Sequence, residues 1–584
     1  MAGESNSSLT GLGKLISFML VLGLLGFGGY VVWNRMKQPT AREQGTQVAP
    51  VAPGSSAPGT VAPKTSDKAQ PDINTKSAVL NEVPRFGAPG AYQMKNNTVD
   101  IELSNYMGYS GLIVANNGLA ASEDSIFFKK FGFKVKITLK EEESRGDVHT
   151  GRLAAVATTA DVLACYGKDF NVIVPAQIGY SRGADGIIVT SDINRINQLK
   201  GKVLSASQFS ESEFFIRYLG QEAGLGVNYI YDLNDTPNPD KINLFFCEDA
   251  FGAADLFLKD LQSGRGRLTG SVSWAPKTTE VVLAAGGKAK FLVTNQNLLL
   301  VGDVLVVNKP FAKSNPKVMQ GLVEGLLEGN RKVRENPEPY LDQLVTAFNT
   351  GKTKPTDLMD RKAIREELQR VHLSNLPENV GFFTGDISMG GSFAQIFSSA
   401  VLTYGSLIRD PVDADYYTGD ARGYLDIAKA SGVFAGETAA ILPIKSSIDK
   451  PLESDPLLSK NIRFFFEPNS AKLDMSSSDN KTNLLGIVKM LQISPGSKVL
   501  LRGHVDNARV PEFQKMGGEA MVQQQALQAM QLSKNRASEV KRVLVENHNV
   551  DDKRIDTIGR GWQEPAGSDS EKNRRVEVYW YTLE

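Results

Sequence analysis

Cysteine and histidine are scarce in this chain of 584 residues, which contains two cysteines and four histidines. Cys165 and Cys247 are too few for a disulfide-dense scaffold or a cysteine-ligated zinc or iron–sulfur centre. They could pair in an oxidising compartment or remain two buried thiols. The histidines lack the HExxH spacing, and packing at a strand end is the favoured interpretation of His504 over metal ligation. We therefore predict no metal and no cofactor.

An excess of charge of one sign is also missing, because 65 basic residues balance 65 acidic residues. Nucleic-acid-binding domains are usually basic, so this composition gives no support for nucleic-acid binding. No GxSxG nucleophile elbow, complete phosphate loop or paired-carboxylate arrangement stands out in the sequence. These absences predict a binding protein rather than an enzyme.

One long apolar run is present, from Leu15 to Trp33, and it contains no Asp, Glu, Lys or Arg. A helix of this length spans the hydrocarbon layer of about 30 Å, and Tyr30 and Trp33 match an interfacial belt. A signal peptide is the alternative, but no small-residue cleavage pattern or lipobox cysteine follows the run. We expect an uncleaved transmembrane anchor at residues 15–33, preceded by a cytoplasmic N-terminus at residues 1–14. The run has no ionisable group, so it would anchor the protein without carrying ions.

Residues 38–78 are rich in Ala, Pro, Ser, Thr and Gly, a composition that cannot bury enough apolar surface to fold. This composition predicts a linker over residues 34–95. A flexible chain of about 40 residues has an r.m.s. span of roughly 35 Å. We expect a second linker at residues 427–458.

From Val99 onward, short apolar strands alternate with longer helical patterns. Such alternation predicts α/β layers with mainly parallel sheets. The expected segments include VDIELSN at 99–105, KVKITL at 134–139, FNVIVPAQI at 170–178, DGIIVTS at 185–191, FFIRYLGQEAGL at 214–225 and DVLVVN at 303–308.

Several short motifs in this region carry a family resemblance. They are GDVHTGRLAAVATT at 146–159, SRGADGIIV at 181–189, LKGKV at 199–203, VSWAP at 272–276 and DVLVV at 303–307. Residues 96–426 resemble periplasmic solute-binding proteins of the nitrate/sulfonate/taurine type. The resemblance implies two α/β lobes joined by crossing strands, with a solute held in the cleft and no reaction performed. The stretch from Asp232 to Asp260 looks like an insertion relative to that family.

Candidate solute-binding residues lie at the junctions between strands and helices. Ser210 to Glu213 have the spacing of a capping box before a helical run, and a helix N-terminus is a ready anion site. We therefore predict a small anionic solute. The alternatives are ordinary caps and loop residues and, for Arg182, a salt bridge with a nearby acid. The candidates are Asn105, Tyr106, Thr158, Thr159, Ser181, Arg182, Ser205, Ser207 and Trp274.

The C-terminal region, residues 459–584, carries the most specific motifs. GHVDN at 503–507, LSKNRA at 532–537, GRGWQEP at 559–565 and NRRVEV at 573–578 follow one another in this order. The set closely resembles the OmpA-like peptidoglycan-binding domain, an α+β fold.

This resemblance implies a site for the diaminopimelate of the peptidoglycan stem peptide. The ligand exposes an ammonium and a carboxylate on one stereocentre. Asp506 would bind the ammonium and Arg536 the carboxylate, with help from Asn573 and Arg574. The alternative is that Asp506 and Arg536 only pair with each other. The sequence departs from the family pattern by an insert after Asn507 and by Ala529, where the family has Asn.

Both resemblances imply a location outside the cytoplasm, although the basic residues flanking residues 15–33 slightly favour the opposite orientation. We predict a single-pass protein of the bacterial inner membrane with its body in the periplasm. It would bind peptidoglycan and capture a solute for transport or sensing, with an ABC permease or an envelope complex as partner. The alternative is a central domain that serves as a protein-interaction platform.

Overall fold

The structure is a computed structural model that describes residues 74–140, 144–353, 358–385, 391–439, 456–467 and 470–581. The predicted anchor at residues 15–33 lies outside the described residues. Among the helices of the described part, none combines the length and the apolar character needed to cross a membrane.

The first lobe is built on a mixed six-stranded sheet with the order β12-β4-β11-β3-β1-β2. Strand β4 is buried along all ten of its residues and lies between β12 and β11. The strands are β1 (Thr98–Ser104), β2 (Lys134–Lys140), β3 (Ala155–Thr159), β4 (Val172–Ser181), β11 (Gly302–Asn308) and β12 (Val371–Leu373).

Helices pack on both faces of this sheet. The longest of them, α10 (Pro316–Glu335), buries an apolar stripe that includes Leu322, Leu326 and Val333. The others are α2 (Ser110–Ala115), α3 (Ile126–Phe131), α4 (Arg145–His149), α5 (Ala160–Tyr166), α9 (Lys309–Ser314), α11 (Leu341–Phe348), α12 (Arg361–Leu368), α13 (Leu376–Thr384), α14 (Phe393–Tyr404), α15 (Asp415–Thr418) and α16 (Ala421–Ala430).

The second lobe is built on another six-stranded sheet, with the order β10-β5-β9-β6-β8-β7. Its strands are β5 (Asp185–Thr190), β6 (Val203–Ser207), β7 (Val227–Ile230), β8 (Ile242–Cys247), β9 (Gly270–Trp274) and β10 (Ala289–Thr294). Its helices are α6 (Glu211–Glu222), α7 (Ala250–Ser263) and α8 (Lys277–Ala284). The stretch from Asp232 to Asp260, predicted as an insertion, contains β8 and most of α7. It is therefore part of the lobe, because β8 pairs with both β6 and β7.

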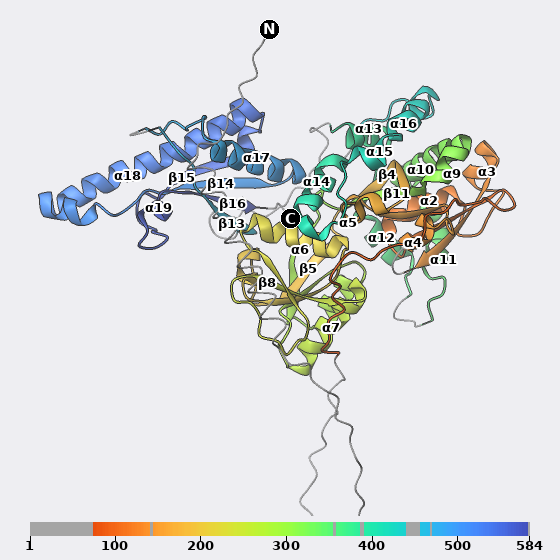
Figure 1. The fold of residues 1–584 in the computed structure, drawn as a ribbon, viewed down its shortest axis with the longest axis horizontal. Helices are drawn as coiled ribbons and strands as arrows, with labels where there is room; N and C mark the ends of the chain where they lie inside the picture. Colours follow the sequence, from red (N-terminus) through yellow and green to blue (C-terminus); the bar gives the residue numbers. More distant parts are fainter. Residues whose placement is uncertain are drawn as a thin grey trace, which may run out of the picture. The chain divides into compact units, whose positions relative to one another are not determined.

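The chain crosses between the lobes twice, from β4 to β5 over residues 181–185 and from β10 to β11 over residues 294–302. In Figure 1 the elements around β4 and β11 and those around β5 and β8 form two separate groups. The crossing strands run antiparallel to their neighbours, whereas β1, β2 and β3 are mutually parallel, as are β6 to β9. The predicted parallel sheets are thus mixed, because each crossing brings a strand in from the other lobe.

The ordered body begins before residue 96, where the predicted linker ends. The Ala78 N–H donates to the Phe246 carbonyl at 2.7 Å, and Val83 and Tyr92 are buried against the body. Val83 and Tyr92 bury apolar surface against the body. An Ala- and Pro-rich linker has too little apolar surface to pack in this way.

The body also continues past residue 426, where the solute-binding-like domain was predicted to end. Helix α16 runs to Ala430, Phe434 is buried, and Glu437 pairs with Arg334 at 2.9 Å. The two cysteines remain free thiols, with Cys165 buried in α5 and Cys247 half-buried at the end of β8.

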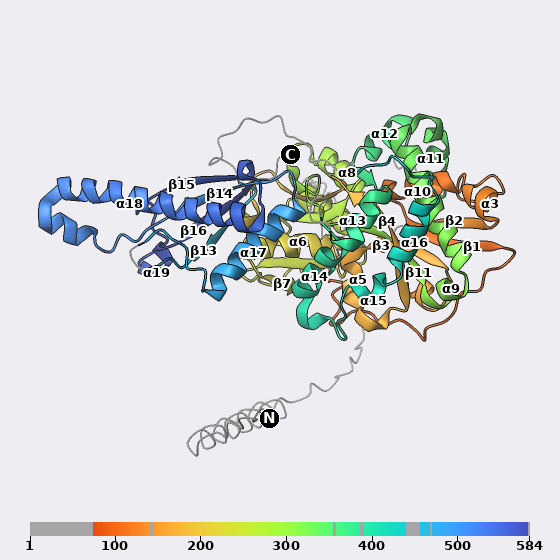
Figure 2. The same ribbon diagram turned by 90° about the horizontal axis from the view of Figure 1, so that it is seen from above.

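The C-terminal domain is a four-stranded sheet with the order β13-β16-β14-β15, packed against α17 and α18 (Figure 2). Gly503 and Gly559 permit this packing, since a Cβ there would lie 2.0 Å from Ser533 O and 2.5 Å from Met530 O of α18. The elements are β13 (Leu458–Ile462), α17 (Ser478–Ile493), β14 (Lys498–Gly503), α18 (Val510–His548), β15 (Ile555–Gly559), α19 (Ser570–Asn573) and β16 (Val576–Tyr581). The predicted insert after Asn507 forms the first part of α18, which bends at Gly517 and Gly518.

Candidate functional site

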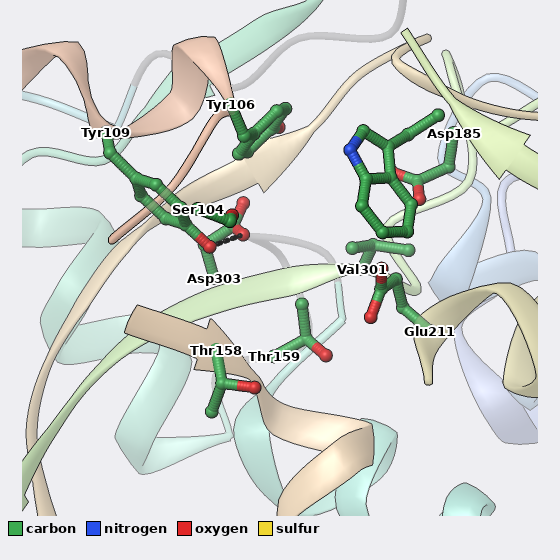
Figure 3. A pocket seen from close by; sticks show the side chains of 10 residues that line it. Ser104, Tyr106, Tyr109, Thr158, Thr159, Asp185, Glu211, Val301 and Asp303 are labelled. Carbon is green, nitrogen blue, oxygen red and sulfur yellow. Dashed lines mark hydrogen bonds between the residues drawn. The ribbon is translucent and has the colours of Figure 1, made fainter. Parts of the chain in front are cut away.

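A small cavity lies where the two lobes meet, at the ends of β1, β3 and β9. Ligands of open α/β sheets bind at such strand ends, where the connections leave a crevice. The cavity has a volume of about 30 Å³, so a bound group would contain only a few heavy atoms. The lining residues are Ser104, Tyr106, Tyr109, Thr158, Thr159, Asp185, Glu211, Trp274, Val301 and Asp303 (Figure 3).

The lining is acidic. It contains three carboxylates, those of Asp185, Glu211 and Asp303, and none of the lining residues is Lys or Arg. The Tyr109 hydroxyl donates to Asp303 Oδ1 at 3.3 Å, and Asn295 Nδ2 donates to Asp185 Oδ2 at 3.2 Å. Burial raises the pKa of Asp185 to about 6, against the opposing effect of hydrogen bonds from Ser181 and Asn295.

Two hydroxyl groups of the lining are buried without a hydrogen-bond partner among the described residues. They are Tyr106 Oη and Thr159 Oγ1. Burial, followed by the negative charges of Asp303 and Asp185, raises the pKa of Tyr106 well above its usual value. Buried polar groups are normally satisfied, so these two hydroxyls are available to a bound molecule.

The structure brings four of the nine predicted solute-binding residues into the cavity lining: Tyr106, Thr158, Thr159 and Trp274. Ser181 lies directly behind the lining, since its hydroxyl accepts a hydrogen bond from the Asp185 N–H at 3.3 Å. The other four are absent from the lining, and a hydrogen bond within the protein is recorded for each of them, for Ser207 through its backbone carbonyl. Asn105 N donates to Lys140 O, Arg182 Nε to Gln296 O and Ser205 Oγ to Ala253 O, while Ser207 is buried at the end of β6.

The predicted capping box at the start of α6 is wrong. The Ser210 hydroxyl donates to Ser207 O at 2.9 Å, and Glu213 accepts from the Phe209 N–H at 2.7 Å. Glu213 also pairs with Arg217 at 2.7 Å. The first turn of α6 therefore holds two carboxylates, those of Glu211 and Glu213, which compete with an anion for the positive end of the helix.

Sequence reasoning missed the acidic side of the cavity. Asp185 and Asp303 begin the motifs DGIIV and DVLVV, which carried the resemblance, but neither residue received a role. Each stands at the start of a strand that follows a crossing between the lobes. An acidic residue at the start of an otherwise apolar strand is the sequence feature that could have indicated this part of the site.

A second candidate site is an open groove in the C-terminal domain. Its floor and walls come from the loop after β14, from α18, from the segment after β13 and from the loop before β16. The groove is lined by Arg463, Phe464, Phe465, Phe466, Glu467, His504, Val505, Asp506, Arg509, Phe513, Gln525, Gln528, Ala529, Leu532, Arg536, Trp562, Arg574 and Arg575.

Asp506 and Arg536 both line this groove, and no ion pair joins them within the part of the chain that the structure describes. Asp506 Oδ1 and Arg536 Nε are buried atoms without a hydrogen-bond partner among the described residues. The Arg536 guanidinium lies 4.9 Å from the centroid of the Phe466 ring, which fixes its plane. The alternative of a structural salt bridge between the two residues is thus not what the geometry shows.

The environment keeps Asp506 ionised. Burial alone would raise its pKa, but hydrogen bonds from Ser570, the Ala508 N–H and Asn573 bring it below the ordinary value. Burial and the positive charge of Arg574 lower the pKa of Arg536, because both disfavour its charged form. A carboxylate bound beside the Arg536 guanidinium would offset both effects.

The two remaining predicted residues occupy different positions. Arg574 lines the groove and is exposed. Asn573 is buried behind the groove, where it accepts from the Ala566 N–H at 2.7 Å and donates to Gly567 O at 3.1 Å. Asn573 therefore shapes the loop and helps to hold Asp506. Ala529 lines the groove at the position where the family has Asn.

His504 is buried in a charge cluster that also contains the exposed Glu564. One ligand atom from each of His504, Glu564 and Glu577 lies within 4.8 Å of the others, which is a metal-like arrangement. However, Glu577 already binds two guanidinium groups, Arg502 at 2.6 Å and Arg575 at 2.5 Å. Although burial would raise the pKa of Glu577, the hydrogen bonds from His504 and Arg575 lower it to about 2. These cations occupy the carboxylate that a metal would need.

Two parts of this chain are similar to known proteins. None of the curated proteins matches it. Among solved structures, the periplasmic aliphatic sulphonate binding protein SsuA from Escherichia coli is 16% identical, covers 56% of this chain and 98% of its own, and has a TM-score of 0.41. The alkanesulfonate-binding protein SsuA from Xanthomonas axonopodis pv. citri, bound to MOPS, is 14% identical over 56% of this chain and 99% of its own, with a TM-score of 0.40.

A further similar structure, the Candida albicans CA3427 gene product with the periplasmic binding protein fold, is 11% identical. It covers 60% of this chain and 99% of its own, with a TM-score of 0.38. The OmpA family matches residues 465–578, which include Asp506, Arg536, Asn573 and Arg574. The C-terminal part of this chain is an OmpA family domain.

Proposed function

We propose that this protein binds peptidoglycan through the groove of its C-terminal domain and a small solute through the cleft of its central body, without catalysing a reaction. One observation carries the first part. Asp506 and Arg536 present opposite charges in one groove and do not pair with each other. A ligand with an ammonium and a carboxylate on one carbon, such as diaminopimelate, satisfies both.

Sedimentation of the full chain with purified diaminopimelate-type sacculi tests this part of the proposal. Asp506→Asn and Arg536→Gln should each reduce binding by roughly a hundredfold, because one ligand charge is then left desolvated and unpaired. Asp552→Asn and Arg542→Gln are matched controls, since both residues pair at the surface outside the groove. Equal sedimentation of all five proteins would refute the assignment.

The central body supports solute binding through its cleft, where aromatic, hydroxyl and carboxylate groups from both lobes converge. The sequence predicted an anionic solute, but the acidic lining does not favour one. A panel of small molecules should include one that raises the thermal midpoint of the full chain by linkage. If no member of a broad panel does so, the body is better described as an interaction platform in an envelope complex.

The location follows from the ligands. Peptidoglycan and the solutes of periplasmic binding proteins lie outside the cytoplasmic membrane, so we place the body in the periplasm. Residues 15–33 would anchor it in the inner membrane, and residues 34–73 would give it reach toward the wall. An ABC permease or an envelope complex is the corresponding partner for the central body.

A further inference from the structure

The groove of the C-terminal domain is larger than its charged pair requires. Its volume is about 630 Å³. The charged pair addresses only an ammonium and a carboxylate on one carbon. The rest of the lining includes two aromatic rings, Phe513 and Trp562, and two neutral amides, Gln525 and Gln528. The groove therefore has room for a second part of the same ligand.

Phe513 and Trp562 come from separate segments that the fold brings together. Phe513 lies at the start of α18, within the insert that departs from the family pattern. Trp562 follows β15 and comes directly after Gly561. The Gly561 carbonyl accepts from the Val505 N–H at 2.9 Å, so this loop lies beside the loop that carries Asp506.

The two rings form an aromatic surface on the wall of the groove. Their centroids are 6.1 Å apart and their planes are inclined by 25°. The Arg509 guanidinium lies 5.0 Å from the centroid of the Phe513 ring and helps to hold it. Both aromatic side chains are half-buried, so each leaves part of its surface open to a ligand.

The amides lie on the face of α18 that also carries Arg536. Spacings of three and four residues place Gln525, Gln528 and Leu532 on one stripe, and all three line the groove. Gln528 is exposed, and its side chain has no hydrogen-bond partner among the described residues. The amide of Gln525 has only a weak contact, with the Met521 sulfur at 3.9 Å. Each amide can therefore still donate to and accept from a ligand.

A sugar ring with an acetamido group matches this combination of side chains. One face of a pyranose ring carries C–H groups, which pack on the negative face of an aromatic ring. Its hydroxyl and acetamido groups need both donors and acceptors, and a glutamine amide supplies both.

The spacing along α18 also fits the architecture of the wall polymer. From Gln528 to Arg536 the helix rises by about 12 Å. In peptidoglycan two residues separate diaminopimelate from the glycan, and an extended linkage of this kind spans about 10 Å. Diaminopimelate bound at Asp506 and Arg536 thus allows a sugar to reach Gln528.

We infer that Phe513, Trp562 and Gln528 form a second subsite of the groove, which binds an N-acetylated sugar of the glycan strand. This inference rests on the proposed peptidoglycan binding and extends it from the stem peptide to the glycan. The sugar ring packs on the aromatic surface, and its polar groups form hydrogen bonds with the amide of Gln528.

Two ligands that differ only in the sugar test this subsite on the full chain. One is L-alanyl-D-glutamyl-diaminopimelate, acetylated at its N-terminus. The other is the same tripeptide attached to the N-acetylglucosamine–N-acetylmuramic acid disaccharide. In calorimetric titrations the disaccharide ligand should bind at least tenfold more tightly, because its second contact is intramolecular once the first has formed.

Tryptophan fluorescence gives a second measurement on the wild type. The disaccharide ligand should change the emission more than the tripeptide does, since the half-buried Trp562 meets the sugar. Trp274 and Trp580 are buried and should respond little.

Variants locate the effect in the groove. Trp562→Ala should bring the affinities of the two ligands within twofold of each other, and Gln528→Ala should reduce the difference at least threefold. Tyr231→Ala and Gln531→Ala are matched controls that should keep the tenfold difference, because both residues are exposed and neither lines the groove. Arg536→Gln should weaken both ligands equally, since it contacts the part that they share. The thermal midpoint of each unliganded variant shows whether it is folded.

The outcomes separate the two proposals. Equal affinity of the wild type for both ligands would overturn the sugar subsite and leave recognition of diaminopimelate intact. A difference that survives both Trp562→Ala and Gln528→Ala would also overturn it, because the sugar would then bind elsewhere. Binding of neither ligand would refute both the subsite and the wall-binding role of the groove. Should Trp562→Ala fail to fold, Gln528→Ala and the fluorescence comparison decide the question.

Discussion

Asp161 lies in the first turn of α5 with its side chain fully buried, and burial raises its pKa to about 7. Glu577 is also buried, yet hydrogen bonds from His504 and Arg575 bring its pKa down to about 2. The difference lies in the partners, since Glu577 binds Arg502 and Arg575, whereas no side-chain cation pairs with Asp161 among the described residues. Desolvation decides the charge in the first case and pairing decides it in the second.

Replacing Asp161 by Asn should stabilise the protein more at pH 8 than at pH 5. The folded pKa lies above the unfolded value of about 3.9, so the folded state binds more protons between pH 4 and pH 7. The free energy of unfolding of the wild type therefore falls as the pH rises through this range. Asn removes that dependence, and the gain over the wild type should grow by a few kcal/mol from pH 5 to pH 8.

Thermal unfolding at both pH values measures this difference. Asp413→Asn is the control, because Asp413 is exposed and should show no pH-dependent gain. A gain for Asp161→Asn that is the same at both pH values would show that Asp161 is not the titrating group.

At this scale, the sequence predicted the groove of the C-terminal domain better than the cleft. Asp506 and Arg536 stand in spaced motifs, and the structure brings both into one groove. Asp185 and Asp303 stand in strand motifs that suggested no role for them, and Glu211 begins a helix. Their proximity depends on two crossings between the lobes, and local patterns do not encode such long-range contacts.

At the scale of elements, the strand and helix predictions follow the hydrophobic pattern and largely agree with the structure. The strands expected at 134–139, 185–191 and 303–308 match β2, β5 and β11 within two residues. The predicted capping box is wrong because the Glu213 carboxylate accepts from the Phe209 N–H and pairs with Arg217. The stretch at 232–260, which the sequence predicted as an insertion, contributes β8 to the second sheet. The sequence pattern does not reveal this, because the burial of β8 depends on the order of the strands.

Gly503 gives the clearest prediction for an element. Gly503→Ala would place a Cβ about 2.0 Å from Ser533 O, so α18 must move away from β14. We expect a loss of about 1–3 kcal/mol in the stability of the C-terminal domain, together with weaker binding to sacculi, because α18 carries Arg536. Calorimetry and sedimentation measure the two effects.

Gly486→Ala is the matched control, since nothing lies within 4 Å of a Cβ at this position of α17. It should be neutral or stabilise the domain by up to about 1 kcal/mol. If Gly503→Ala behaved in the same way, the close packing of α18 on β14 would be wrong.

At the scale of the whole molecule, the described body extends beyond the edges that the sequence predicted for it. The described body includes residues that were predicted to belong to the linkers. A few apolar side chains in them, such as Val83, Tyr92 and Phe434, are buried against the body. An isolated apolar residue in a polar stretch gives no periodic signal, so the sequence pattern cannot reveal this packing.

The predicted anchor at residues 15–33 makes a direct prediction for the cell. The protein should stay in the membrane fraction after washing with alkali or high salt, because such washes remove only peripheral proteins. N-terminal sequencing of the product checks the same point. Soluble periplasmic protein that begins near Asn34 would contradict the anchor.

The central claim is that Asp506 and Arg536 together recognise the charged stereocentre of diaminopimelate. Calorimetric titration of the full chain with two stem peptides tests it most directly, one containing diaminopimelate and the other lysine, which lacks the second carboxylate. The wild type should bind the diaminopimelate peptide at least tenfold more tightly, since only this peptide offers a carboxylate to Arg536. Arg536→Gln should abolish the preference. Equal affinity of the wild type for both peptides would contradict the account.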